Sequence, residues 1–529
     1  MAKESSGRHA FLVAAGILIS RMVGLVRQGV FAKYFGLSDA GDAFTAAFRV
    51  PNLLQNLFGE GVLSASFIPV YANLLAQGEE EESGRVAGAI GAILAVVSSL
   101  VVLVGIATTP YLIFAIAPGF TGEKRELTIR LVRVLFPGAG LLVFSAWCLG
   151  ILNSHRKFFL SYTAPVIWNV AMIATMIWYR DLDQSGLAFN LAWGSVIGSA
   201  LQFGVQLPTV LALVARLKLR LEAHSAHVRE VLRNFGPVFI SRGVVQISAY
   251  VDQMLGSLLG EGAVTALTNV QSMYTLPVSL FGMSISAAEL PAMSSALGDE
   301  HQIADALRPR LNTGLRRIAF FVVPSAMAFF VLGDVITAVL YQRGHFTHAD
   351  TIYVWGILAG SAVGLLASTL ARLYASTYYA LRDTRTPLRY AILRVALTTG
   401  LGYLCAIPLP KWIGVDPHWG AAGLTASAGV AGWVEFALLR RTLNSRIGAT
   451  GVPAALLARL WGSAVIGAAA GWLLKPTVVA RGTYVTAVVV LGVYGVLYFA
   501  ATYAMRVEEC AAVVGRAIAL SRRPSRRGR

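Results

Sequence analysis

Long apolar stretches separated by short polar segments recur along the whole chain. Each is long enough for a helix to cross roughly 30 Å of hydrocarbon. Backbone groups inside a bilayer have no water to bind, so segments of this kind must be helical. The pattern predicts an all-α polytopic membrane protein with about fourteen transmembrane helices, near residues 10–34, 42–76, 86–116, 128–153, 159–179, 187–215, 231–258, 264–295, 314–341, 351–381, 387–408, 418–439, 453–474 and 483–505.

The composition agrees with this pattern and argues against an enzyme. Of 529 residues, 56% are hydrophobic and only 13% are charged, whereas about 25% charged residues is usual in a soluble domain. The longest polar segments, near 216–230 and 296–313, are too short for a catalytic domain. The three cysteines are far apart and form no CxxC pair, so neither a disulfide framework nor a metal site is predicted. We expect a transporter without a cofactor, driven by a coupling cation or the membrane potential.

The placement of basic residues predicts the orientation of the chain. A net charge of +17 could indicate a nucleic-acid partner. However, most Lys and Arg residues fall in loops on the side of the N-terminus, which is the positive-inside pattern of a bacterial inner-membrane protein. Both termini are therefore expected in the cytoplasm. The basic tail at 511–529 is expected to contact anionic membrane lipids, and no nucleic acid is expected.

Two parts of the chain resemble each other at a spacing of about 223 residues. Leu-Phe-Gly at 57–59 and at 280–282, and Gly-Leu-Leu at 140–142 and at 364–366, are each followed by a proline further along. Two parallel repeats of six spans can enclose a central cavity and rock about it. We therefore predict an N-terminal lobe at 1–220, a C-terminal lobe at 221–445, two extra helices at 446–510 and the tail at 511–529.

Charged residues inside the predicted spans mark the candidate site. A charge at mid-membrane costs roughly 2.5–3.5 kcal/mol and usually faces water or a partner. Arginines outnumber acids there, and guanidinium groups suit phosphate oxygens well. Proline and glycine at 51 and 59–61 are expected to break the second span beside a cavity. The candidate substrate-binding residues are Arg21, Arg27, Asp42, Arg49, Glu60, Arg242 and Arg372. Asp252 is either a ligand of a coupling cation or the partner of Arg242.

Several motifs resemble the MurJ/MviN family of lipid II flippases, part of the multidrug/oligosaccharidyl-lipid/polysaccharide exporter superfamily. They are ISRMVGLVRQ at 19–28, GDAFTAAFRVPNLLQNLFGEGVLSASFIPVY at 41–71, APGF at 117–120, GILNSHRKF at 150–158, LYQRGHFTHADT at 340–351 and YYALRDTRTP at 378–387. The resemblance implies two six-helix lobes plus two helices. It also implies transfer of an undecaprenyl-linked peptidoglycan precursor to the outer leaflet, with functional roles for Arg21, Arg27, Asp42 and Glu60.

The chain departs from the family pattern at three places. Gln55 stands where the family commonly has an arginine, and Gln271 and Ser272 stand where it has an Asp-Arg pair. As a hypothesis, Arg242, Arg49 or Arg372 compensates for the missing arginines. The sodium site of some relatives uses acids and an amide in the seventh and eleventh helices, and Asp252 could supply one ligand. Residues 392–404 offer only two threonines for it, which argues against sodium coupling.

The predicted function is flipping of lipid II by alternating access. The predicted partners are the undecaprenyl-linked substrate, membrane lipids and proteins of cell-wall synthesis. Two alternatives stay open. One is a family member that carries a different polyprenyl-linked glycan, and the other is a membrane scaffold for cell-wall enzymes that transports nothing. A membrane-embedded transferase would need a cluster of acids at headgroup level, which the sequence does not offer.

Overall fold

The structure is a computed structural model that describes residues 2–214, 217, 219–221, 225–286, 289, 293 and 300–521. Every regular element within these ranges is a helix, so the prediction of an all-α fold is confirmed. Ten of the helices in the described ranges are long and apolar enough to cross a membrane. The count of fourteen spans stays a prediction.

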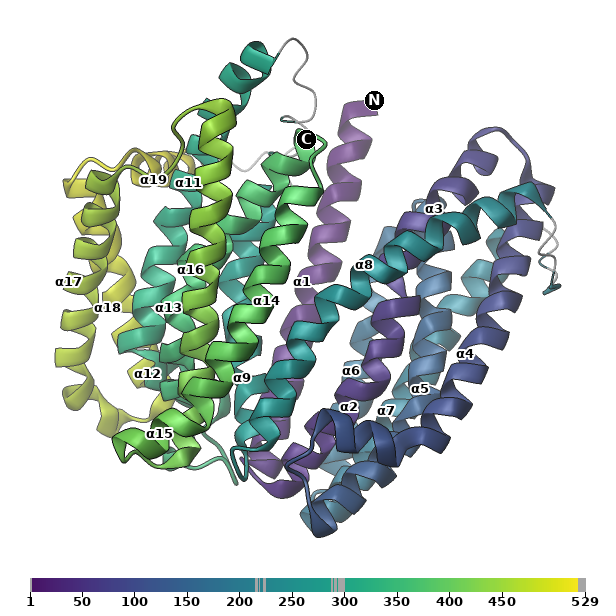
Figure 1. Cartoon of the computed structure of the whole chain (residues 1–529), viewed down its shortest axis with the longest axis horizontal. Coiled ribbons are helices and arrows are strands. Elements are labelled where there is room, and N and C mark those ends of the chain that lie inside the picture. Colours follow the sequence, from purple (N-terminus) through teal and green to yellow (C-terminus); the bar gives the residue numbers. More distant parts are fainter. Residues whose placement is uncertain are drawn as a thin grey trace, which may run out of the picture. The chain divides into compact units, whose positions relative to one another are not determined.

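The chain divides into two compact units (Figure 1). Unit 1 is Met1–Thr265 with Arg343–Phe346, and unit 2 is Ala266–Gln342 with Thr347–Arg529. The predicted boundaries at 220, 445 and 510 concern the sequence repeat and stay predictions.

The helices of unit 1 are α1 Ala2–Phe35, α2 Asp39–Phe58, α3 Glu60–Ala76, α4 Glu80–Ile116, α5 Gly122–Ser154, α6 Phe158–Trp178, α7 Gln184–Leu213 and α8 Ala226–Ser257. Its two main hydrophobic cores contain different parts of α5, the first half in one and the second half in the other. Phe67 and Tyr71 of α3 pack with Trp147 in one of them. Phe31 of α1 and Phe44 of α2 pack with Leu131 in the other. The helix α5 therefore organises the unit.

The second span breaks at a single glycine. Pro51 lies inside α2 without ending it, so the prediction that the helix is interrupted there is wrong. The helix ends instead at Gly59, and α3 begins at the next residue. A Cβ atom on Gly59 would lie 2.1 Å from the carbonyl oxygen of Gln55. Only a residue without a side chain fits this break.

Helix α9, Ala263–Pro277, starts in unit 1 and continues in unit 2. The other elements of unit 2 are η1 Val278–Met283, α11 Glu300–Val331, α12 Gly333–Tyr341, α13 His348–Ala380, α14 Arg385–Ala406, α15 Pro408–Ile413, η2 Pro417–Trp419, α16 Gly420–Ile447, α17 Ala454–Val478, η3 Val479–Arg481, α18 Thr483–Ala504 and α19 Glu508–Ser521. Gly364 of α13 and Gly429 of α16 let these two helices approach closely, because a Cβ on Gly364 would lie 2.4 Å from the Gly429 Cα. Close contacts through small residues are the usual means of helix packing in membranes.

The Asp383 carboxylate stabilises the turn between α13 and α14. Asp383 accepts hydrogen bonds from the backbone and hydroxyl of Thr386 and forms a 2.7 Å ion pair with Arg446 of α16. Burial alone would raise the pKa of Asp383, but these hydrogen bonds and the Arg446 charge outweigh it and lower the pKa to about 2. The turn lies outside the predicted spans, so the carboxylate titrates with the solvent.

This lowered pKa predicts an acid-dependent part of stability. A carboxylate whose folded pKa is below its unfolded value stabilises the fold above the unfolded value, near 4, and loses that contribution as the pH falls toward 2. We expect Asp383→Asn to lower the apparent melting temperature by a few degrees at pH 7. The difference from wild type should shrink below about pH 4. Thermal unfolding in detergent across this range measures it, and a difference independent of pH would contradict the assignment.

Candidate functional site

Arg27 of α1 lies against an aromatic pair in unit 1. Its guanidinium carbon is 5.2 Å from the centre of the Trp168 ring and 5.7 Å from that of Phe48. The two rings stack with centroids 5.5 Å apart, and one Arg27 N–H group points to the Met172 sulfur at 3.5 Å. Ring faces attract a cation without neutralising it. Within the described part of the chain, Arg27 has no carboxylate partner.

The aromatic contacts orient Arg27 while leaving most of its N–H groups available. A guanidinium has five donors in a planar fork that matches two oxygens of a phosphate. Holding this group among rings reduces the side-chain freedom that binding would otherwise remove. The remaining N–H donors are suited to the oxygens of an anion.

Arg21 lies six residues before Arg27 on the same helix, and its side chain is exposed. The separation is about 9 Å along the helix axis. The two arginines therefore belong to one helix at different depths. Gly24 between them lies against Asn169 of α6, whose amide oxygen would be 3.9 Å from an added Cβ.

Arg49 connects α2 with α8. Its guanidinium donates to the Gln253 side-chain oxygen at 3.4 Å, and the Tyr250 hydroxyl donates to the Arg49 carbonyl at 3.1 Å. Asp252 interacts electrostatically with Arg49. The structure thus brings two of the predicted residues, Arg49 and Asp252, together inside unit 1.

Asp42 is fully buried and bonded entirely to protein groups. Its carboxylate accepts from the backbone N–H groups of Gly262 and Thr265, each at 2.8 Å, and pairs with Lys124 of α5 at 2.8 Å. Gly262 and Thr265 flank the start of α9, so Asp42 caps that helix from a different part of the chain. Sequence reasoning did not single out Lys124, although its position just after the APGF motif was visible.

One further predicted residue, Arg372, is not brought into this group. The side chains of Glu60 and Arg242 lie outside the described residues. Arg372 belongs to α13 of unit 2, where its side chain is exposed. Gln55 lines a small pocket of about 20 Å³ with Asn52 and Trp168. Its neutral side chain adds no cation at that position.

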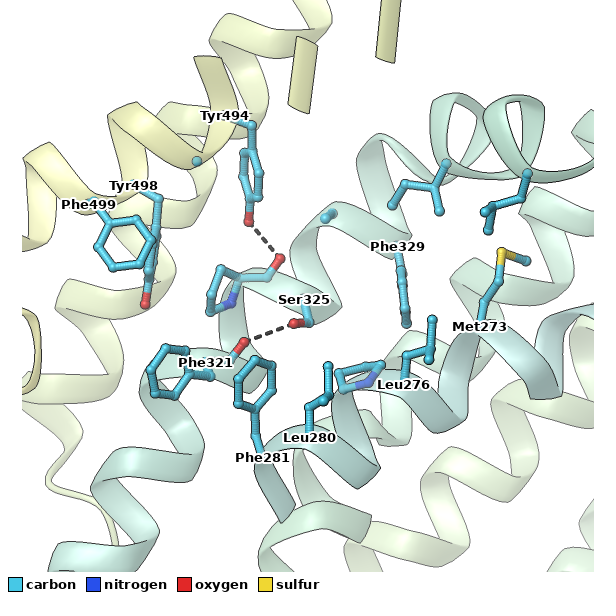
Figure 2. A pocket seen from close by; sticks show the side chains of 16 residues that line it. Met273, Leu276, Leu280, Phe281, Phe321, Ser325, Phe329, Tyr494, Tyr498 and Phe499 are labelled. Atoms are coloured by element: carbon cyan, nitrogen blue, oxygen red, sulfur yellow. Dashed lines mark hydrogen bonds between the residues drawn. The ribbon is translucent and has the colours of Figure 1, made fainter. Parts of the chain in front are cut away.

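Unit 2 contains an apolar pocket of about 370 Å³ (Figure 2). Residues of α9, η1, α11, α12 and α18 line it, among them Leu280, Phe281 and Phe329. The labelled hydroxyl groups at its wall all have acceptors. Tyr494 donates to the Pro324 carbonyl and Ser325 to the Phe321 carbonyl (Figure 2), and Tyr498 donates to the Phe320 carbonyl. A pocket whose polar atoms are satisfied internally suits an apolar ligand.

The family model described as "Lipid II flippase MurJ" matches residues 31–495. The lipid II flippase MurJ of Burkholderia cenocepacia is 32% identical over 448 residues, covering 83% of this chain and 84% of that protein. The probable lipid II flippase MurJ of Rhizobium tropici is 31% identical, covering 82% of this chain and 80% of that protein.

Solved structures agree on the fold. A lipid II flippase MurJ in an inward closed conformation matches with a TM-score of 0.77 at 22% identity, covering 94% of this chain and 98% of that one. An inward-facing multidrug resistance MATE family transporter matches with a TM-score of 0.65 at 17% identity, covering 82% of this chain and 98% of that one. With a family model that spans most of its length and relatives above 30% identity, the chain belongs to the lipid II flippase MurJ family.

Proposed function

We propose that this protein flips lipid II, the undecaprenyl-pyrophosphate-linked peptidoglycan precursor, from the inner to the outer leaflet of the bacterial inner membrane. Arg27 carries the proposal, because it is an intramembrane cation held against a stacked pair of rings with no carboxylate partner among the described residues. The pyrophosphate would supply the missing negative charge. The names of the relatives support the same cargo.

The transport cycle is proposed to be alternating access between two lobes. The finer architecture that goes with it has fourteen spans, six in each lobe and two more after them, and both termini in the cytoplasm. Arg21, Arg27 and Arg49, with Glu60, Arg242 and Arg372, would line the path of the headgroup, while Asp42 holds the start of α9. Conversion between the two states would expose the headgroup first to one side and then to the other.

The apolar pocket of unit 2 supports a lipid-linked cargo. An isoprenoid chain has no polar groups and needs only a wall of methyl, methylene and ring atoms. The pocket offers such a wall at Leu276, Leu280 and Phe321. We propose that part of the undecaprenyl tail rests there while the headgroup is bound.

The energy source is proposed to be a coupling cation or the membrane potential. Moving one elementary charge across the membrane is worth about 2.3 kcal/mol per 100 mV. The Asp252 carboxylate would bind the coupling cation. Arg49, which interacts electrostatically with Asp252, would compete with that cation for the carboxylate. Enzymes of cell-wall synthesis are proposed as further partners.

A different polyprenyl-linked glycan is the second candidate cargo. Gln55 is neutral, and both Gln271 and Ser272 form hydrogen bonds within α9, to Thr275 and to the Thr268 carbonyl. These positions therefore add no cation to the site. A cargo with fewer negative charges would need fewer arginines.

Complementation of a flippase-depleted bacterium tests the proposal. Wild-type protein should restore growth and prevent lipid II from accumulating in the inner leaflet, because it supplies the missing transport step. Arg21→Ala should fail to do so at equal membrane abundance. The control is Arg85→Ala, which removes an exposed arginine that pairs with Glu82. Rescue by Arg21→Ala would favour a scaffold, and failure of the wild type would favour another glycan.

A further inference from the structure

Unit 2 contains a second group of charges, on α13, α14 and α16. The Arg394 guanidinium lies 3.1 Å from the Glu435 carboxylate. Arg372 interacts electrostatically with both residues and with Tyr274, whose hydroxyl meets that of Ser368, one turn before Arg372. Among the residues that the structure describes, Arg372 has no hydrogen bond or ion pair of its own. The group therefore has two guanidiniums, one carboxylate and a net charge of +1.

Both arginines lie deep within their helices. Arg372 is eight residues before the end of α13, and Arg394 is nine residues after the start of α14. A short turn joins these two helix ends, so the residues lie about 12 Å and 13.5 Å from the same side. That depth approaches the middle of a hydrocarbon core of roughly 30 Å. An unpaired cation at such a depth is costly and usually serves a site.

Polar side chains flank Arg372 along its helix. Ser368, Arg372 and Ser376 follow each other at intervals of four residues and form one stripe along α13. Thr398 lies one turn after Arg394 on α14 and is buried. A surface facing lipid would instead carry apolar side chains at these positions. Arg372 therefore has polar neighbours along its own helix, on the exposed side of α13.

We propose that Arg372 and Arg394 bind a single carboxylate of the peptide carried by the lipid-linked headgroup. The inference rests on the proposed function, since it assigns a second contact to the same cargo. A carboxylate matches the net charge of +1 and the planar fork of a guanidinium. A pyrophosphate would leave excess negative charge, and Glu435 would repel it. Glu435 acts as a positioning residue that holds Arg394 in place.

The test uses full-length protein in lipid nanodiscs and three ligands: lipid II, lipid II with amidated peptide carboxylates, and undecaprenyl pyrophosphate. Wild type should bind lipid II about 10- to 100-fold more tightly than the amidated form, because a charged hydrogen-bonded contact is lost. Arg372→Gln should bind the two forms equally. Its affinity for undecaprenyl pyrophosphate should be unchanged, which also shows that the variant is folded.

Two further variants sharpen the result. Arg389→Gln removes an exposed arginine near the start of α14 and should keep the preference for free carboxylates. Glu435→Gln raises the net charge of the group to +2 and should strengthen binding of undecaprenyl pyrophosphate.

The possible failures are distinguishable. If Arg372→Gln weakens the binding of undecaprenyl pyrophosphate as much as the binding of lipid II, the bound group is a phosphate and the assignment is overturned. If it keeps the wild-type preference for free carboxylates, Arg372 does not contact the cargo and the assignment is also overturned. Loss of the proposed function itself would appear as wild-type protein that binds none of the three ligands.

Discussion

Replacing Arg27 by alanine is expected to abolish flipping while leaving the protein folded. The wild-type guanidinium can form two charged hydrogen bonds to the pyrophosphate, and each such bond is worth about 1.5–3 kcal/mol. Losing both corresponds to a reduction of about a hundredfold or more in affinity for the cargo. Since Phe48 and Trp168 stack on each other without Arg27, the surrounding helices should keep their packing. Lipid II translocation in proteoliposomes, at equal protein content, measures the effect.

A lysine at the same position separates charge from geometry. Arg27→Lys keeps the cation and its contact with the rings but cannot form the bidentate fork. We expect activity between that of wild type and that of the alanine variant. Full activity of Arg27→Ala would remove the main support for pyrophosphate binding. Arg85→Ala again serves as the matched control.

Replacing Asp42 by alanine is expected to have the largest effect on stability. It would leave the Lys124 ammonium, which is 12% exposed, without its buried partner, and the N–H groups of Gly262 and Thr265 without an acceptor. Breaking a buried ion pair by removing one partner costs about 3–5 kcal/mol. The apparent melting temperature in detergent, compared at one scan rate because membrane proteins unfold irreversibly, should fall sharply.

Asp39 provides a closely matched control. It also pairs with Lys124 at 2.8 Å, but its side chain is 60% exposed, whereas that of Asp42 is 0% exposed. Exposed ion pairs contribute about 0–1 kcal/mol, so Asp39→Ala should be close to wild type. Equal effects of the two alanine variants would show that burial of Asp42 does not govern its contribution.

The helical fold could be predicted from the sequence because the bilayer leaves the backbone few alternatives. Apolar length alone identified α4, α5, α13 and α18. The location of the break in the second span could not be predicted as easily, because proline and glycine are both helix breakers in general. A proline is tolerated inside a membrane helix where neighbouring groups satisfy the freed backbone groups. At Gly59, by contrast, a Cβ atom would lie 2.1 Å from the Gln55 carbonyl oxygen.

The site was only partly predictable for a related reason. A charged residue in an apolar span is costly without a partner, and this consideration identified Arg27, Arg49 and Asp42 as candidates. The identity of the partner depends on packing between helices that are distant in sequence. Lys124 lies 82 residues from Asp42, and Trp168 comes from α6. No periodicity in the chain connects these residues.

Among the residues that the structure describes, three arginines occupy left-handed backbone positions just after helices: Arg156, Arg382 and Arg506, with φ of 59°, 59° and 54°. Glycine is the usual residue in this position. In each case the following N–H group closes the helix end, as from Asp383 to the Tyr378 carbonyl. Arg156 and Arg382 are 226 residues apart, close to the spacing of the predicted repeat. Arg506, which lies outside the predicted repeat, has the same geometry, so these helix ends do not test the duplication.

The segment Arg343–Phe346 belongs to unit 1 although it lies far along the chain. The His345 N–H group donates to the Lys33 carbonyl at 2.9 Å, at the end of α1. During synthesis the ribosome must therefore produce about 80 residues beyond Thr265 before the first unit can acquire its last piece. Until then the Lys33 carbonyl at the end of α1 lacks the His345 N–H group. In a nascent chain that stalls earlier, this helix end would stay accessible to membrane chaperones and proteases.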